Sequence, residues 1–244
     1  MGKNKYKRFQ ENETFSILFQ PDFYEIFGKD FELKGKWNEK VFGNDHPIVL
    51  ELGCGKGEYT VGLAKRFPEK NFVGVDVKGA RLWRGAKTVV EDKMPNAAFI
   101  RTKIDFITSF FAPGEVSEIW VTFSDPQPKR PRKRLTSPAF LERYARFLKT
   151  DGIVHLKTDS LELHRFTKDM VQMNGLELME ANEDIYGSGR ADDVLSIETT
   201  YEKLFKSQGK TITYLAFRML GKEVTLYPEE TYFERPEVRA DATR

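Results

Sequence analysis

One stretch decides the fold of this chain: Val49-Leu50-Glu51-Leu52-Gly53-Cys54-Gly55-Lys56-Gly57. Its first half is an apolar strand, and its second half is a loop with glycine at every second position. Glycines let a ligand approach the backbone closely, and the N-terminus of the helix that follows offers unsatisfied N–H groups. The stretch therefore predicts a strand, a loop and a helix that together bind a nucleotide-like ligand.

The rest of the chain alternates short apolar, β-branched runs with helical patterns, which is typical of βαβ units and a buried parallel sheet. We expect strands at residues 48–52, 71–77, 97–104, 118–123, 152–157, 176–180 and 211–219. Helices are expected at 58–67, 79–92 and about 137–148. The predicted fold class is α/β, a doubly wound and mostly parallel sheet whose ligands bind beyond the carboxyl ends of its strands.

Length and composition fit one globular domain with extensions. Of 244 residues, 40% are hydrophobic and 31% charged, enough apolar material for a real core. We expect an N-terminal extension at 1–40, beginning as a flexible arm anchored by phenylalanines, a catalytic-type domain at 41–235 and a disordered tail at 236–244. Because there is no apolar signal region and no run of roughly 18 apolar residues, we expect a cytoplasmic protein without a membrane segment.

The few sulfur and imidazole side chains exclude several chemistries. Cys54 is the single cysteine, so no internal disulfide is possible, and no histidine is placed to activate it as a nucleophile. His46, His155 and His164 are far apart and in no ligand spacing. We therefore expect no metal site, and we interpret Cys54 as a small buried spacer.

Acidic residues around the loop indicate which ligand it binds. Asp76 ends the second strand, 19 residues after Gly57, where a carboxylate can accept both hydroxyl hydrogens of a ribose. Glu58 stands where the dinucleotide fingerprint has its third glycine, and Glu51 would repel a pyrophosphate. S-adenosyl-L-methionine has a ribose, two cationic groups and no phosphate, so the sequence favours it over a dinucleotide, as in a nicotinamide-dependent dehydrogenase, and over a purely structural glycine turn.

A dense basic run follows the fourth strand. That strand breaks at Pro126 and Pro128 and presents Asp125 at the same sheet edge as the glycine loop, while Asp159 closes the fifth strand. The run places five basic side chains in six positions: Lys129, Arg130, Arg132, Lys133 and Arg134. The net charge is only +2, so this clustering is what predicts binding to phosphates. Residue types and spacing thus indicate an S-adenosylmethionine enzyme with a polyanionic substrate.

Three elements of the sequence resemble one known family. They are the loop at 51–57, the segment Phe123-Ser124-Asp125-Pro126-Gln127-Pro128-Lys129 with its basic run, and Glu198-Thr199-Thr200-Tyr201-Glu202. Together they resemble the tRNA (guanine-N7)-methyltransferases, over about residues 48–217. The resemblance implies a seven-stranded, Rossmann-like class I methyltransferase fold. It also implies transfer of a methyl group from S-adenosyl-L-methionine to N7 of guanosine 46 in the variable loop of tRNA.

The resemblance also implies roles for individual residues. The cofactor would be contacted by Glu51, Gly53, Gly55, Gly57, Asp76, Asp105 and Asp125. The substrate would be held by Lys129, Asp159, Thr199, Thr200, Tyr201 and Glu202, with Arg130, Arg132, Lys133 and Arg134 on the RNA backbone. Asp125, the catalytic residue, would lie between cofactor and guanine. Gln127 stands where the family commonly has Trp, so Tyr201 or Phe123 would pack on the nucleoside instead.

The chemistry of the acceptor atom sets what the catalytic residue must do. N7 of guanine has an in-plane lone pair and no hydrogen, so no strong base is needed, and Asp125 is expected to orient the base and to stabilise its developing charge. Two alternatives stay open. One is a methyltransferase of another RNA or a small molecule, and the other is a non-catalytic RNA-binding protein on this scaffold. The sequence leaves both a monomer and a homodimer possible.

Overall fold

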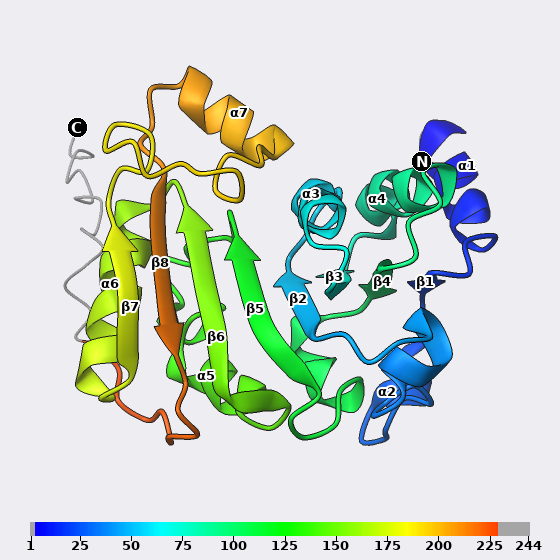
Figure 1. Ribbon diagram of the computed structural model, residues 1–244, viewed down its shortest axis with the longest axis horizontal. Coiled ribbons are helices and arrows are strands. Elements are labelled where there is room, and N and C mark those ends of the chain that lie inside the picture. Colours follow the sequence, from blue (N-terminus) through cyan, green and yellow to red (C-terminus); the bar gives the residue numbers. More distant parts are fainter. Residues whose placement is uncertain (1–2, 229–244) are drawn as a thin grey trace, which may run out of the picture.

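The computed structural model describes residues 3–228 and is built on an eight-stranded sheet (Figure 1). The strands are β1 (Leu18–Phe19), β2 (Ile48–Leu52), β3 (Asn71–Asp76), β4 (Ala97–Arg101), β5 (Val116–Thr122), β6 (Leu148–Thr158), β7 (Glu177–Asn182) and β8 (Thr213–Arg218). Their order is β1-β4-β3-β2-β5-β6-β8-β7, and only the pairs made by β8 are antiparallel. Since the chain leaves central β2 first toward β3 and later toward β5, the switch point of the sheet lies between β2 and β5.

Helices cover both faces of this sheet. They are α1 (Lys3–Asn12), α2 (Phe23–Ile26), α3 (Glu58–Arg66), α4 (Gly79–Glu91), α5 (Pro138–Tyr144), α6 (Leu161–Met173) and α7 (Thr200–Ser207). Three short helical turns complete the set: η1 (Asn38–Phe42), η2 (Ile104–Ser109) and η3 (Pro131–Lys133). Of the helices described, none is long and apolar enough to cross a membrane.

Strand β2 shows why the sequence folds as two layers around a sheet. Ile48, Leu50 and Leu52 point into one hydrophobic core, which they share with α5 and α6, whereas Val49 points into a second core shared with α3 and α4. Side chains alternate across a strand, and all five residues of β2 are buried, so both of its faces are covered. The predicted bounds of this strand, 48–52, are those observed.

The N-terminal extension is built into the domain. The expected flexible arm is instead helix α1, which lies beside α4 (Figure 1), with the Asn12 amide donating to the Gly79 carbonyl at 2.9 Å. Phe15 and Leu18 are buried, and β1 pairs with β4. The sheet therefore has eight strands where seven were predicted, because this extension supplies a short edge strand. The expected tail at 236–244 lies outside the described residues.

Candidate active site

A cavity of about 1080 Å³ opens at the carboxyl ends of β2, β3, β5 and β6. Segments that are far apart in the sequence meet on its wall. They include Gly53, Gly55, Asp76, Asp125, Lys133, Asp159, Thr199, Thr200 and Tyr201, all of which were predicted to act in binding or catalysis. The doubly wound topology brings these strand ends to one edge, as Figure 1 shows for the region beneath α7.

The glycine loop takes a backbone path that side chains would oppose. Gly53, Gly55 and Gly57 have φ of +79°, +58° and +71°, the left-handed region in which a Cβ is strained. At Gly57 a Cβ would also lie 2.6 Å from the Phe99 ring and 3.2 Å from the Cα of Gly85. Glycine is therefore required here both by conformation and by the close approach of α3 to α4.

Asp76 fastens this loop to the end of β3. One carboxylate oxygen accepts from the N–H of Gly55 at 3.0 Å, and the other accepts from the N–H of Lys78 at 2.7 Å. Each oxygen of a carboxylate has a second lone pair. Asp76 lines the cavity, so those lone pairs can take the hydroxyls of a ribose.

Glu51 lies behind the cavity wall rather than on it. One oxygen accepts from the N–H and hydroxyl of Thr60, at 2.8 and 2.5 Å, and the other accepts from the hydroxyl of Thr122 at 2.5 Å. Burial raises the pKa of Glu51 to about 7, although these hydrogen bonds oppose the rise. The carboxyl group thus ties β2 to the first turn of α3 and to the end of β5.

Asp125 lies on the cavity wall in a strained turn. Phe123 and Gln127 on either side of it have φ of +49° and +47°, a region that residues other than glycine seldom occupy. The carboxylate accepts from the N–H of Gln127 at 3.0 Å. Such strain clusters at functional sites because the surrounding structure must hold it. Ser124, the residue directly before Asp125, has a buried hydroxyl without a hydrogen-bond partner among the described residues, and it also lines the cavity.

The basic run divides into exposed and buried members. Lys133 lines the cavity, while Lys129, Arg130 and Arg132 are exposed beside it. Arg134 is buried: its Nε donates to the Pro126 carbonyl at 3.1 Å, and its guanidinium lies 4.2 Å from the centre of the Phe166 ring. This arginine holds the Asp125 turn in place, and the exposed members are the ones available to a polyanion.

Asp105 lies outside the main cavity. It borders a second hollow of about 340 Å³, whose wall includes Gly53, Asp76, Arg130 and Lys133. Its carboxylate lies 3.9 Å from the ammonium of Lys133. The second hollow shares Gly53 and Asp76 with the main cavity, so it is the side of the site nearest to η2.

Helix α7 is joined to the glycine loop across the cavity. The N–H and hydroxyl of Thr200 donate to the carboxylate of Glu58, at 2.8 and 2.5 Å, and Lys56 donates to the same hydroxyl at 3.0 Å. Thr199 caps the helix by accepting from the N–H of Glu202 at 3.1 Å. Both threonines therefore order α7 over the cavity.

Tyr201 presents an aromatic face to the cavity. Its ring stacks with Phe205 at 6.3 Å between centroids, and the guanidinium of Arg81 lies 5.5 Å from its centre. All three residues line the cavity. Asp159, which also lines the cavity, pairs with Lys210 at 2.5 Å. Stacked rings flanked by cations suit the face of a nucleobase and its phosphate.

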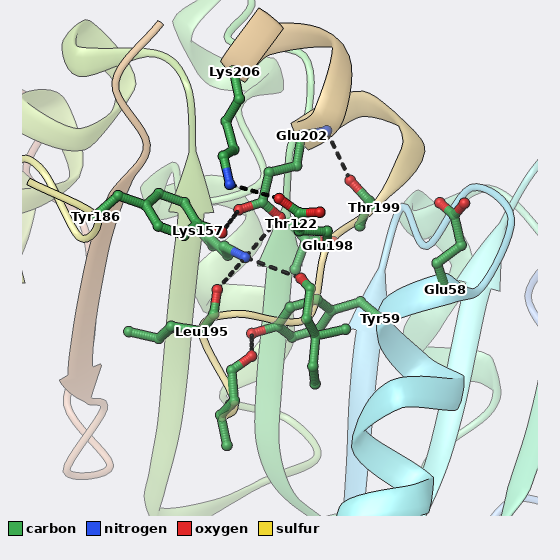
Figure 2. A network of polar contacts seen from close by, with 12 residues as sticks. Glu58, Tyr59, Thr122, Lys157, Tyr186, Leu195, Glu198, Thr199, Glu202 and Lys206 are labelled. Carbon is green, nitrogen blue, oxygen red and sulfur yellow. Dashed lines mark hydrogen bonds and ion pairs between the residues drawn. The ribbon is translucent and has the colours of Figure 1, made fainter. Parts of the chain in front are cut away.

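Glu202 is fully buried and forms an ion pair with Lys157 at 2.8 Å (Figure 2). The same ammonium donates to the carbonyls of Leu195 and Ile197, at 2.6 and 3.1 Å, and Tyr186 donates to the second oxygen of Glu202 at 2.9 Å. Burial lowers the pKa of Lys157, and the Glu202 charge opposes that effect. The side chain of Glu202 thus points from α7 into the protein and anchors the helix there, and it does not line the cavity.

Several residues of the site were missed by reasoning from sequence. Glu58 and Ser124 lie in or beside recognised segments and Arg81 in a predicted helix, but no role in the site was predicted for any of the three. Lys157 did carry a signal: it is a lysine at the end of a predicted strand that also holds Ile153, Val154 and Leu156. A charged residue at such a position is buried only when it is paired.

Comparison with known proteins shows the family. Residues 45–215 match a family model described as "Putative methyltransferase". A tRNA (guanine-N(7)-)-methyltransferase of Bacteroides thetaiotaomicron is 49% identical over 241 residues, which cover 99% of this chain and 92% of the relative. Another, of Christiangramia forsetii, is 54% identical over 221 residues, which cover 89% of this chain and 99% of the relative.

A likeness to solved structures shows the fold. The structure of 16S rRNA methyltransferase KamB matches with a TM-score of 0.58 at 16% identity, over 74% of this chain and 91% of that one. At this identity the match establishes a class I methyltransferase fold alone. The relatives, in contrast, match from end to end at about half of all positions. This chain belongs to the tRNA (guanine-N(7)-)-methyltransferase family.

Proposed function

We propose that the protein transfers the methyl group of S-adenosyl-L-methionine to N7 of a guanosine in tRNA, namely guanosine 46 of the variable loop. The family supports the reaction, since the relatives are named for it. The observation that carries the proposal is the position of Asp125. It shares one cavity with the glycine loop and Asp76. The backbone of Phe123 and Gln127, on either side of Asp125, is held in the strained left-handed region.

The residues present fit the cofactor. Gly53 and Gly55 leave the loop backbone open to a ligand, and Asp76 keeps lone pairs for a ribose. The Ser124 hydroxyl, which has no hydrogen-bond partner within residues 3–228, offers one more polar contact. When bound, S-adenosylmethionine supplies an electrophilic methyl group on a sulfonium. The cavity volume of about 1080 Å³ exceeds the roughly 300–1,000 Å³ typical of a single small-ligand site, which leaves room for a nucleobase beside the cofactor.

Asp125 would act on the base rather than on a proton. The N7 lone pair forms the new N–CH₃ bond as the S–CH₃ bond breaks, and the imidazole ring of guanine gains the positive charge that the sulfonium loses. The carboxylate of Asp125, held by the N–H of Gln127, stabilises that charge and fixes the base at the near-attack distance. No residue has to remove a proton from N7.

The substrate side of the cavity would hold an exposed base. A guanine inside a folded tRNA has to leave its tertiary pairing, and Tyr201 with Phe205 offers a stacked surface for its face. The exposed cations Lys129, Arg130 and Lys133 would hold the backbone without reading sequence. This function would place the protein in the cytoplasm, where tRNA is modified, and its chemistry calls for no metal ion.

The test is incubation of the protein with unmodified tRNA and methyl-labelled S-adenosylmethionine, followed by nucleoside mass spectrometry. We expect labelled 7-methylguanosine from the variable loop, with kcat reduced at least 100-fold in Asp125→Ala and cofactor affinity retained. Label in another nucleoside would contradict the assigned atom. Cofactor binding without labelled tRNA would move the search to other RNAs or small molecules, and failure to bind the cofactor would leave an RNA-binding protein.

A further inference from the structure

An aromatic cluster lies exposed outside the cavity. Helix α2 and the residue after it present Phe23, Tyr24 and Phe27, which are 47%, 82% and 60% exposed. Phe27 stacks on Phe23 at 4.8 Å between ring centroids, and Phe106 of η2 meets Phe23 edge-on at 5.5 Å. Large aromatic rings gathered on a surface in this way mark a binding site more often than isolated ones do.

Two of these rings, those of Phe27 and Phe106, line a hollow that also carries charge. The aromatic hollow has a volume of about 420 Å³ and is lined by Phe27, Lys29, Lys34, Asp105, Phe106 and Arg146 among others. Lys34 is paired with Asp30 at 2.6 Å, and Arg146 lies 3.7 Å from Glu142. Lys29 donates only to the Tyr24 carbonyl, at 3.2 Å, and has no carboxylate partner within residues 3–228. An exposed ring face thus stands beside a cation that is open to a phosphate.

The aromatic hollow borders the second hollow, on the side away from the main cavity. Asp105 lines both it and the second hollow, and the second hollow shares Gly53, Asp76 and Lys133 with the main cavity. The exposed basic residues Arg130 and Lys133 lie along this path. A chain of nucleotides that leaves the cavity past these cations would reach the aromatic rings next.

We propose that the aromatic hollow binds an unpaired nucleotide of the tRNA substrate, with its base stacked on Phe27 and its phosphate on Lys29. Unpaired RNA bases are recognised mainly by stacking on aromatic side chains, and cations beside the rings take the phosphates. This inference rests on the proposed function for the identity of the RNA. It adds a contact site outside the methyl-transfer cavity, formed by residues of the N-terminal extension.

The test compares the affinity for unmodified tRNA, by filter binding at fixed salt, of the wild type and single variants. Phe27→Ala should weaken binding about five-fold or more, since one base–aromatic stack contributes roughly 1–3 kcal/mol, and Lys29→Ala should weaken binding and reduce its salt dependence through loss of one phosphate contact. Phe27→Tyr keeps the ring face and should stay within two-fold of the wild type. Met173→Ala, which removes a 46% exposed side chain of α6, is the matched control and should change nothing.

The outcomes separate this inference from the proposed function. Wild-type affinity in both Phe27→Ala and Lys29→Ala, with thermal stability unchanged, would overturn the inference whether or not the protein makes 7-methylguanosine. Loss of self-association in Phe27→Ala, seen by sedimentation and without weaker tRNA binding, would make the cluster a dimer interface and overturn it as well. Weaker binding by an enzyme that methylates a nucleoside other than guanosine would uphold the contact site while the proposed function fails.

Discussion

The buried pair of Lys157 and Glu202 gives the sharpest test of how helix α7 is held. Neither side chain is exposed, and the ammonium has three acceptors: one carboxylate oxygen and the carbonyls of Leu195 and Ile197. Replacing Glu202 with Leu leaves a buried cation with two neutral acceptors and also removes the partner of the Tyr186 hydroxyl. Breaking a buried pair in this way costs about 3–5 kcal/mol, against a total stability of about 5–15 kcal/mol for a typical domain.

The assay is thermal and urea unfolding of the single and double variants. At roughly 2–4 °C per kcal/mol for a protein of this size, Glu202→Leu should lower Tm by about 6–20 °C. The double variant Lys157→Met/Glu202→Leu removes both charges and should recover most of that loss, because a well-packed apolar pair can match a buried ion pair. The control is Glu183→Gln, which breaks an exposed pair with Arg165 and should cost less than about 1 kcal/mol. A single variant as stable as this control, or a double variant no better than the single, would refute the reasoning.

Three further predictions follow from the site. The folded-state pKa of Glu51, about 7 against an ordinary 4.5, means that the folded chain keeps a proton which the unfolded chain loses between these pH values. Stability should therefore fall as pH rises through that window, and Glu51→Gln should remove up to about 3 kcal/mol of the fall in urea unfolding. Glu58→Ala should raise the KM for tRNA about five-fold or more through loss of the charged hydrogen bonds to Thr200, with no matching change in cofactor affinity measured by calorimetry. Arg130→Ala and Lys133→Ala should each reduce the slope of log affinity against log salt by about 1 in filter binding, and an unchanged slope would exclude phosphate contacts.

The sheet, the glycine loop and the places of Asp76 and Asp125 at the sheet edge could be predicted because their signals are local. An apolar run such as 48–52 identifies its own strand, and the left-handed turns at Gly53, Gly55 and Gly57 require glycine whatever the rest of the chain does. Asp76 and Asp125 could be placed because parallel strands end at a common edge. The family matched over residues 45–215 confirms the resemblance expected over about 48–217.

The substrate half was harder to predict because its side chains are assigned by contacts between distant segments. Glu202 and Arg134 were expected to hold the substrate, but both are buried, and burial of a charged residue depends on a partner elsewhere in the chain. Lys157 is 45 residues from Glu202 in sequence, and nothing in the sequence near Lys157 identifies Glu202 as its partner. The first twenty or so residues look polar and flexible, yet Glu11 accepts hydrogen bonds from Trp83 and Lys87 of α4, a contact that a sequence pattern does not reveal.

The departure of the loop from the dinucleotide fingerprint now has a physical explanation. Where that fingerprint uses its third glycine to bring helix and strand together, this chain achieves close packing one residue earlier, at Gly57 against Phe99 and Gly85. The next position is then free to carry a side chain, and Glu58 uses it to bind Thr200 at the start of α7. The turn at Gly57 and Glu58 therefore shapes the cofactor loop and also binds α7, the segment proposed to hold the RNA. Because Glu58 is the first residue of α3, a movement of α7 acts directly on the first turn of α3. The residue that argues against a dinucleotide is the one that links the two halves of the site.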